Sequence, residues 1–423
     1  MSERKLRALG RKALIVLLFA AAVLLLRETG YYAGLREKLQ HGGERQETLA
    51  GTESTGSARP AGAVQPMAAV VNLGGSEHWG AVYDAERVTE IFRRFSADFA
   101  EALGSAELPE PLSEDRLYAC LNSCGVYLRF YCSQPLELLS AWLGTEASSE
   151  AAGRSAELMC LCADGGETLL CCRTAEGDCF CCKTAVSAER LCERTAEYSA
   201  DATQYAFENK SLQGGDGCAV LWGGSRTVPA VNCAVPQLGT AEMNALLQSV
   251  GMNSYVTGSY TEADGTAVYI DEESTLRLSP AGSMNYRCPA FPAAEETRTL
   301  SEAVTLAWQT AENCMGASCG DGTLIFAGAS CGENGRYTVC FDYAVNGIPV
   351  HFASGHGAEI VLRGDRVIQA RMQLCSFTFG EETTALLPDL QAFAIAAAGD
   401  ASAALCYTAG GETMYCNWVR ADG

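Results

Sequence analysis

Positively charged residues are scarce in this sequence, and a segment in which they outnumber acidic residues lies at the N-terminus. The 423 residues hold 30 Lys and Arg against 51 Asp and Glu, which gives a net charge of −21 at pH 7. Residues 1–40 hold eight Lys and Arg and three Asp and Glu, so they carry +5 and residues 41–423 carry −26. A nucleic-acid surface needs clustered basic side chains. The shortage therefore argues against nucleic acid as a partner.

Long apolar runs are equally scarce. One unbroken run of fourteen apolar residues covers 13–26, and no other stretch approaches the roughly 18 that indicate a transmembrane helix. Five basic residues precede it: Arg4, Lys5, Arg7, Arg11 and Lys12. A bilayer core needs roughly 20 residues of helix, so this shorter run also fits the apolar part of a cleaved signal peptide.

Two features favour a retained anchor over a cleaved signal. Arg11, Lys12 and Arg27 have long side chains that can reach the lipid headgroups, and Tyr31 and Tyr32 lie where interfacial aromatic residues gather. No small-x-small cleavage site follows the run directly. The basic flank predicts a cytoplasmic N-terminus. We therefore expect a single-pass cell-membrane protein, held by residues 13–26, whose bulk is extracytoplasmic.

The rest of the sequence alternates between helical and strand-like patterns. Apolar residues three and four apart predict helices at 84–103, 135–142, 187–198, 240–250, 300–313 and 388–398. Alternating segments predict strands at 116–121, 126–132, 157–163, 167–174, 178–184, 254–261, 266–271, 275–278, 323–327, 336–345, 348–352, 358–363, 366–379, 403–408 and 412–419. Short turns rich in Asp, Glu and Gly separate many of these strands, which indicates antiparallel pairing.

The predicted fold class is α+β, with an N-terminal transmembrane helix followed by extracytoplasmic domains of antiparallel sheets packed with helices. Residues 1–35 are the cytoplasmic basic start and the anchor. Residues 36–68, rich in Gly, Ser, Thr and Glu, are a flexible linker. Residues 69–238, with a cysteine-rich meander, and 239–423 form the first and second extracytoplasmic domains. The stretch that leads up to residue 235 shows no clear period.

Cysteine is abundant, with 21 residues, and eight of them lie between 160 and 192. Their spacing follows strands: Cys160 and Cys162 share one face, whereas the neighbours Cys171 and Cys172 point to opposite faces. This pattern favours cysteine as a small buried apolar residue, with some disulfides as the main alternative. A metal cluster is disfavoured because no second C-x2-C matches 179–182 and the chain holds only four histidines.

Catalytic signatures are missing or lie in the wrong context. Phosphate-loop and dinucleotide fingerprints are absent. Ser318 and Ser330 each sit in a G-x-S-x-G pattern, but neither lies between a strand and a following helix, as a nucleophile elbow requires. Nothing in the spacing pairs Cys340 with His351 or His356. We predict no enzyme, and we assign no catalytic, cofactor-binding or metal-binding residue.

Two segments carry a family resemblance. Residues 254–270 include Tyr-Thr-Glu-Ala-Asp-Gly-Thr at 260–266, and residues 343–350 read Tyr-Ala-Val-Asn-Gly-Ile-Pro-Val. These segments resemble the YycH/YycI-type accessory proteins of the WalK sensor-kinase system in Gram-positive bacteria. The resemblance implies one transmembrane helix, a large outside α+β part, and a role in tuning a membrane kinase. Residues 13–26 would then contact other helices, with Ala20, Ala21 and Ala22 permitting close approach.

The sequence thus predicts a membrane-anchored regulatory protein that modulates a sensor histidine kinase, or contacts a related accessory membrane protein, through protein–protein and transmembrane-helix contacts. Two alternatives from other classes remain. One is a tethered envelope module that binds cell-wall material or a secreted protein, and the other is a thiol-dependent envelope enzyme.

Overall fold

The computed structural model describes residues 65–212, 215–253, 257–288, 298–332, 335–399, 401–409 and 412–421. The predicted anchor at 13–26, its candidate contact residues Ala20, Ala21 and Ala22, and most of the linker lie outside these residues. Among the residues described, no helix is both long enough and apolar enough to cross a membrane. What is described is a mixed α+β structure of helices and antiparallel sheets, which confirms that part of the predicted fold class.

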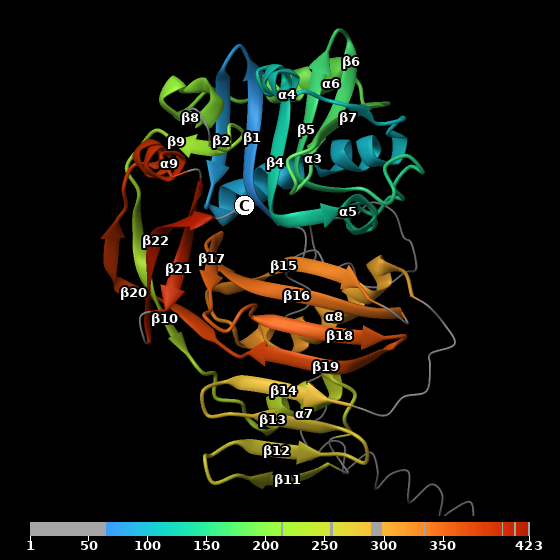
Figure 1. Cartoon of the computed structure of the whole chain (residues 1–423), viewed down its shortest axis with the longest axis vertical. Helices are drawn as coiled ribbons and strands as arrows, with labels where there is room; N and C mark the ends of the chain where they lie inside the picture. Colours follow the sequence, from blue (N-terminus) through green and yellow to red (C-terminus); the bar gives the residue numbers. More distant parts are fainter. Residues whose placement is uncertain are drawn as a thin grey trace, which may run out of the picture. The chain divides into compact units, whose positions relative to one another are not determined.

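An antiparallel sheet organises the first part of the described chain (Figure 1). In spatial order its strands are β2 (Glu77–Val82), β1 (Pro66–Gly74), β4 (Gly125–Pro135), β5 (Ser155–Asp164), β6 (Glu167–Arg173), β7 (Cys179–Thr184) and β3 (Glu110–Pro111). Four helices accompany it: α3 (Ala85–Ser105), α4 (Glu114–Leu121), α5 (Leu136–Leu143) and α6 (Ala188–Thr195). The predicted meander at 157–184 is therefore confirmed as β5, β6 and β7.

Both faces of this sheet are covered. Helices α3 and α6 pack on one face, where Trp79 of β2 and Phe95 of α3 both contact Tyr198. Helix α4 and the segment 203–222 cover the other face, where Tyr127 of β4 contacts Tyr205 edge to face. That segment holds the short strands β8 (Thr203–Tyr205) and β9 (Val220–Trp222) and the 3-10 turns η1 (Ala206–Glu208) and η2 (Lys210–Leu212).

Helix α3 begins where the sequence predicts. The Asp84 side chain accepts a hydrogen bond from the Arg87 backbone N–H and so caps the first turn. The buried side chains lie three and four residues apart, at Val88, Ile91, Phe95, Phe99 and Leu103. This spacing makes one continuous apolar stripe, which is the feature that the sequence shows most clearly.

The strand predicted at 116–121 is wrong, because these residues form helix α4. Ser113 caps the helix through a hydrogen bond from the Arg116 N–H, and Glu114 and Asp115 place negative charge in its first turn. The buried residues are Leu117, Cys120 and Leu121, at helical spacing. The start signals outweigh the short alternating pattern that suggested a strand.

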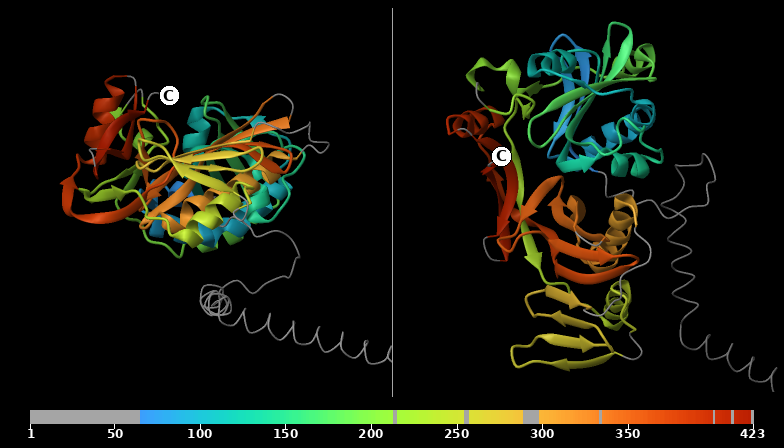
Figure 2. Two further views of the ribbon diagram at one scale, coloured as in Figure 1. Left: turned by 90° about the horizontal axis from the view of Figure 1, so that it is seen from below. Right: turned by 45° about the vertical axis from the view of Figure 1, so that its right-hand side comes forward.

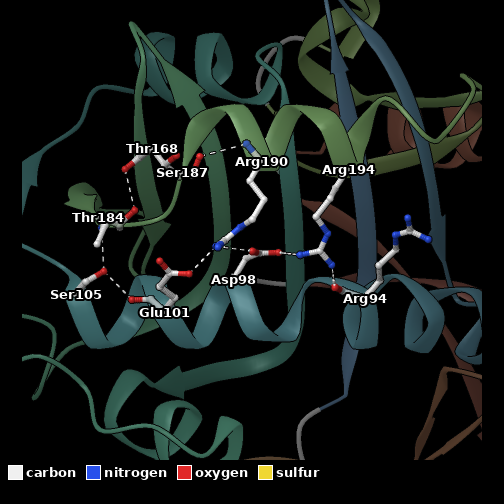
Figure 3. A network of polar contacts seen from close by, with 10 residues as sticks. Arg94, Asp98, Glu101, Ser105, Thr168, Thr184, Ser187, Arg190 and Arg194 are labelled. Atoms are coloured by element: carbon white, nitrogen blue, oxygen red, sulfur yellow. Dashed lines mark hydrogen bonds and ion pairs between the residues drawn. The ribbon is translucent and has the colours of Figure 1, made fainter. Parts of the chain in front are cut away.

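An ion-pair network joins the two helices on the first face (Figure 3). The buried Asp98 carboxylate on α3 accepts hydrogen bonds from Arg190, at 3.1 Å, and from Arg194, both on α6. Arg190 also pairs with Glu101. A buried carboxylate must be paired to remain ionised, so Asp98 fixes how α6 lies against α3.

A longer sheet organises the second part of the chain. Its strands, in spatial order, are β11 (Gly258–Thr261), β12 (Ala267–Ile270), β13 (Thr275–Leu278), β14 (Ser283–Arg287), β19 (Arg366–Gln373), β18 (Ala358–Arg363), β16 (Arg336–Val345), β17 (Ile348–His351), β21 (Ser402–Ala409), β22 (Thr413–Ala421), β10 (Thr227–Ala234) and β20 (Ser376–Ala385). Strand β15 (Gly322–Cys331) pairs with β16. The pairing of β17 with β21 is parallel, and the other described pairs of this sheet are antiparallel.

Three helices accompany this sheet: α7 (Thr240–Ser249), α8 (Leu300–Cys314) and α9 (Asp389–Ala397). Helices α7 and α8 contact each other, and α8 contacts β15, β16 and β18, so the two lie on one face of the sheet (Figure 2). Helix α9 packs against β21 and β9. The helices predicted at 240–250, 300–313 and 388–398 are thus confirmed.

Three features of this sheet differ from the sequence-based expectation. The segment predicted as one strand at 366–379 is two strands, β19 and β20, because the chain turns at 374–375 and β20 pairs with β10 instead of extending β19. Strands β10 and β14 were not predicted. Strand β10 precedes the predicted boundary at residue 238 and pairs with β20 and β22, and Arg59–Gly423 forms one compact unit. The boundary itself stays a prediction.

The turn between β16 and β17 touches the first part of the chain. Asn346 and Gly347 both have positive φ, 49° and 80°, as the predicted two-residue Asn-Gly hairpin turn requires. The Tyr131 hydroxyl donates a hydrogen bond of 2.8 Å to the Gly347 carbonyl. A Cβ at Gly347 would lie 3.1 Å from the backbone nitrogen of Ala85 and 3.2 Å from that of Asp84. Glycine is therefore needed here for both backbone conformation and close approach.

A buried ion network holds the segment 203–222 on its face of the sheet. The Asp216 carboxylate accepts hydrogen bonds from Arg129 of β4 and, at 2.7 Å, from Arg173 of β6. Burial would raise the pKa of Asp216, but the two guanidinium groups outweigh it and hold that pKa well below its usual range. Nearby, the Tyr127 hydroxyl donates to the Cys218 carbonyl at 2.8 Å.

Replacing Gly347 with alanine tests the turn contact. We expect the free energy of unfolding of the purified full chain, from urea titration, to fall by about 2–5 kcal/mol, because a left-handed alanine costs ~1–2 kcal/mol and overpacking adds ~1–3 kcal/mol. Gly177→Ala is the matched control: φ is 93°, and nothing lies within 4 Å of an added Cβ. Equal losses in the two variants would contradict the close approach.

Replacing Asp216 with asparagine tests the buried network. We expect a loss of about 3–5 kcal/mol at pH 7, because two buried guanidinium groups lose their shared anion. Glu262→Gln, in the exposed pair with Arg277, should change little. Since folding lowers the pKa of Asp216, its contribution is complete above the unfolded value of about 4 and falls as the pH drops below it. Thermal unfolding of the unmodified protein and of the Asp216→Asn variant between pH 6 and pH 3 should therefore show their difference in stability narrowing as the pH falls. A difference in stability that stays constant would contradict this prediction.

Candidate functional site

The serine, cysteine and histidine residues considered as catalytic candidates do not form a catalytic set in the part of the chain that the structure describes. The Ser318 hydroxyl donates to the Met315 carbonyl at 3.2 Å in the turn η3 (Gly316–Ser318), and Ser330 lies within β15. Burial raises the pKa of Cys340 to about 11, so its thiol is almost fully protonated at neutral pH. His356 pairs with Asp342 at 2.9 Å, not with Cys340. Ser318, Ser330, Cys340 and His356 therefore do not assemble a serine or thiol nucleophile with a histidine base.

The cysteines serve mainly as buried packing residues. One disulfide joins Cys124, which follows α4, to Cys192 of α6. The other nineteen are free, and thirteen of these are buried. A buried thiol behaves as a small apolar side chain. The sequence-based interpretation of the cysteine spacing is confirmed, because neighbours such as Cys171 and Cys172 point to opposite, equally covered faces of the sheet.

Four of these thiols gather between α4 and the sheet, and we refer to Cys120, Cys160, Cys162 and Cys171 as the thiol cluster. Cys160 and Cys162 lie two apart on β5, and Cys171 on β6 is directly opposite Cys160. The Sγ atoms of Cys162 and Cys171 are 3.9 Å apart. The Sγ atoms of Cys120, Cys162 and Cys171 all lie within 4.8 Å of one another, and all three residues are buried.

The pKa values of the thiols in the cluster shift in opposite directions. Hydrogen bonds to Cys162, first from Cys120 and then from Cys160 and Cys171, lower the pKa of the Cys162 thiol well below its usual range. The same interaction raises the pKa of Cys120 to about 12. Arg116, which pairs with Asp164, adds a positive charge that further favours the Cys162 thiolate. Sequence patterns alone do not reveal this site, because Cys120 falls in the segment 116–121 that they predict as a strand, whereas it lies on helix α4.

A second candidate feature is an exposed apolar region near the C-terminal end of the described chain. Large exposed apolar side chains include Phe379 of β20, Leu387 just before α9, Leu390 and Ile395 of α9, and Tyr415 of β22. The Ile395 side chain is 66% exposed. Strand β20 is also an edge strand of its sheet. Exposed apolar side chains beside a sheet edge are typical of protein-binding surfaces.

A cavity of about 410 Å³ lies between the end of α7 and the turns of the β-sheet. Its lining carries four carboxylates, from Asp271, Glu272, Glu273 and Asp365, and one guanidinium, from Arg366. The negative lining disfavours an anionic ligand.

The comparisons with known proteins bear on the fold. No family model matches the sequence, and no curated protein matches it either. Among solved structures, the chain is similar to the crystal structure of YycH from Bacillus subtilis, with a TM-score of 0.56 and 11% sequence identity. The likeness covers 87% of this chain and 96% of that chain. At this identity it shows the fold, which is YycH-like.

Proposed function

We propose that this protein is a membrane-anchored extracytoplasmic regulator that modulates a sensor histidine kinase through protein–protein and transmembrane-helix contacts. The observation that carries the proposal is the YycH-like fold over 96% of the matched chain. It agrees with the resemblance of residues 254–270 and 343–350 to accessory proteins of the WalK system. That resemblance is the source of the kinase as partner.

The N-terminal sequence supports the membrane part of the proposal. Residues 13–26 follow a strongly basic segment, so they would cross the membrane with the N-terminus in the cytoplasm. Ala20, Ala21 and Ala22 would let a second helix approach closely, because small side chains permit tight packing in lipid. Contact with a kinase helix inside the bilayer is the route by which the protein would act on signalling.

The exposed apolar region around α9 supports an outside contact. Burying a side chain such as Ile395 or Leu390 under a partner gains about 1.5–3 kcal/mol for each residue that is fully covered. Helix α9 is firmly placed for this role, because the buried Asp389 at its start accepts hydrogen bonds from Arg226 at 3.0 and 3.1 Å and from the Trp222 N–H at 2.9 Å.

A tethered module for cell-wall material is less well supported. The cavity of about 410 Å³ at the end of α7 carries four carboxylates and one guanidinium, a net negative lining that disfavours anionic wall polymers. A thiol-dependent enzyme is also less well supported, because among the described residues no histidine is a hydrogen-bond partner of the exposed Cys331 thiol.

Exchanging the anchor tests the membrane contact. We expect that replacing residues 13–26 with an unrelated transmembrane segment, at equal expression, will change kinase-dependent transcription in the bacterium that carries the gene. The change follows because specific helix contacts in lipid depend on side-chain shape. A conservative control keeps the segment and replaces only Val16 with leucine. Unchanged output in the exchanged protein would argue against transmembrane-helix contact.

Placing a charge on α9 tests the outside contact. We expect Ile395→Glu to reduce in vivo cross-linking of the full chain to the kinase by roughly tenfold or more, because a carboxylate would be desolvated in the interface. Leu108→Glu is the matched control, since Leu108 is 71% exposed and lies outside this region. Circular dichroism should show both variants folded. Equal cross-linking by both variants would remove α9 from the interface while leaving the anchor contact open to its own test.

A further inference from the structure

The thiol cluster has the composition and spacing of a metal site. Strand alternation puts Cys160 and Cys162 on one face of β5, and pairing puts Cys171 of β6 on that same face. Helix α4 packs over β4 and β5 and brings its buried Cys120 to them. Three separate elements thus direct thiols to one buried point that offers sulfur ligands alone.

The distances fit metal coordination better than a disulfide. A disulfide joins sulfurs about 2.05 Å apart, whereas the Cys162 and Cys171 sulfurs are 3.9 Å apart. Four thiolates around zinc, each with a Zn–S bond of about 2.3 Å, form a tetrahedron whose edges are about 3.8 Å. Cys162 is directly opposite Leu169, so Cys162 and Cys171 are diagonal neighbours across the two strands. Diagonal neighbours have Cα atoms about 7–8 Å apart, beyond the usual disulfide range.

The geometry points to a zinc site in which Cys120, Cys162 and Cys171 are ligands and Cys160 supplies the fourth thiolate. Sulfur ligands without oxygen or nitrogen select thiophilic ions such as Zn²⁺ or Cu⁺ over Mg²⁺ and Ca²⁺. Four protein thiolates form a closed tetrahedral site of the structural kind. The site is independent of the proposed regulatory function, because its residues belong neither to α9 nor to the anchor segment 13–26.

The surroundings favour the charge that such a site carries. The Arg116 guanidinium, which pairs with Asp164, provides positive charge near the cluster. Zinc bound to thiolates is negatively charged overall, and a nearby cation offsets part of that charge. Binding would clamp α4 to β5 and β6, close to the disulfide between Cys124 and Cys192.

Metal analysis of the full chain tests the site. The protein is purified in detergent under anaerobic reducing conditions, loaded with ZnCl₂ and washed with a weak chelator. We expect about one zinc per chain by elemental analysis, because a closed thiolate site binds zinc tightly. Replacement by Co²⁺ should give the intense visible absorption and the near-ultraviolet sulfur-to-metal bands of tetrahedral thiolate coordination. These spectra are read on the unmodified chain and so do not depend on whether a variant folds.

Single replacements then identify the ligands. Cys120→Ser, Cys162→Ser and Cys171→Ser should each lower zinc retention by roughly tenfold or more. Cys172→Ala is the matched control, because Cys172 is an adjacent buried thiol of β6 on the opposite face of the sheet. It should retain zinc fully.

Three results would overturn the assignment. The first is no zinc, or stoichiometric copper in its place, in the reduced full chain. The second is equal loss of zinc in Cys162→Ser and Cys172→Ala with both variants folded by circular dichroism. The third is a Cys160–Cys171 disulfide, found by mass spectrometry of protein alkylated under the same reducing purification.

Discussion

Burial of both faces of the first sheet is the constraint on which much of this structure depends. An antiparallel sheet commonly leaves one face in water, but α3 and α6 cover one face here and α4 with the segment 203–222 covers the other. Consecutive residues of β5, from Leu158 to Cys162, are all fully buried. Such strands need apolar side chains on both faces. Cysteine meets that need, which explains why thiols occur throughout β5, β6 and β7 without forming disulfide pairs there.

Apolar burial is not directional, so it does not by itself fix where each covering layer lies on the sheet. Buried carboxylates help to fix it on both sides of the sheet. On one face, Asp98 forms ion pairs with two arginines of α6. On the other face, Asp216 forms ion pairs with Arg129 and Arg173 of the sheet. Moving a layer would separate these pairs and leave buried charges uncompensated, so the carboxylates favour the observed placement of each layer.

The sequence predicted the elements whose signals are local. The apolar stripe of α3, the turns of the β5–β7 meander and the Asn346-Gly347 hairpin all depend on residues close together in the chain. Strand β10 was missed because what makes it a strand is pairing with β20 and β22, about 150 residues or more further along. Its own sequence, with Pro229 in the middle, carries little strand signal.

The same distinction explains the candidate site. The spacing of Cys160, Cys162 and Cys171 was enough to place them on shared faces of strands, but it gave no metal motif because the fourth thiol comes from 40 residues earlier. Reading 116–121 as a strand then hid Cys120, which reaches the cluster only as part of helix α4. One error in secondary structure thus removed a ligand that no spacing rule could restore. A site assembled from a helix and two strands is visible only once their packing is known.

The two parts of the described chain meet through apolar packing, such as Trp142 of α5 against Phe326 of β15, and through specific polar contacts that hold α9 in place. Arg226 pairs with Asp389 at the start of α9 and also donates to the Val82 carbonyl at the end of β2. The Tyr83 hydroxyl accepts a hydrogen bond from the Leu405 N–H at 3.0 Å. A displacement of α9 would therefore leave a buried arginine and a buried carboxylate unpaired, at a cost of several kcal/mol. Binding that leaves α9 in place breaks none of these contacts, so the fold favours docking on a fixed α9 surface over docking that displaces the helix.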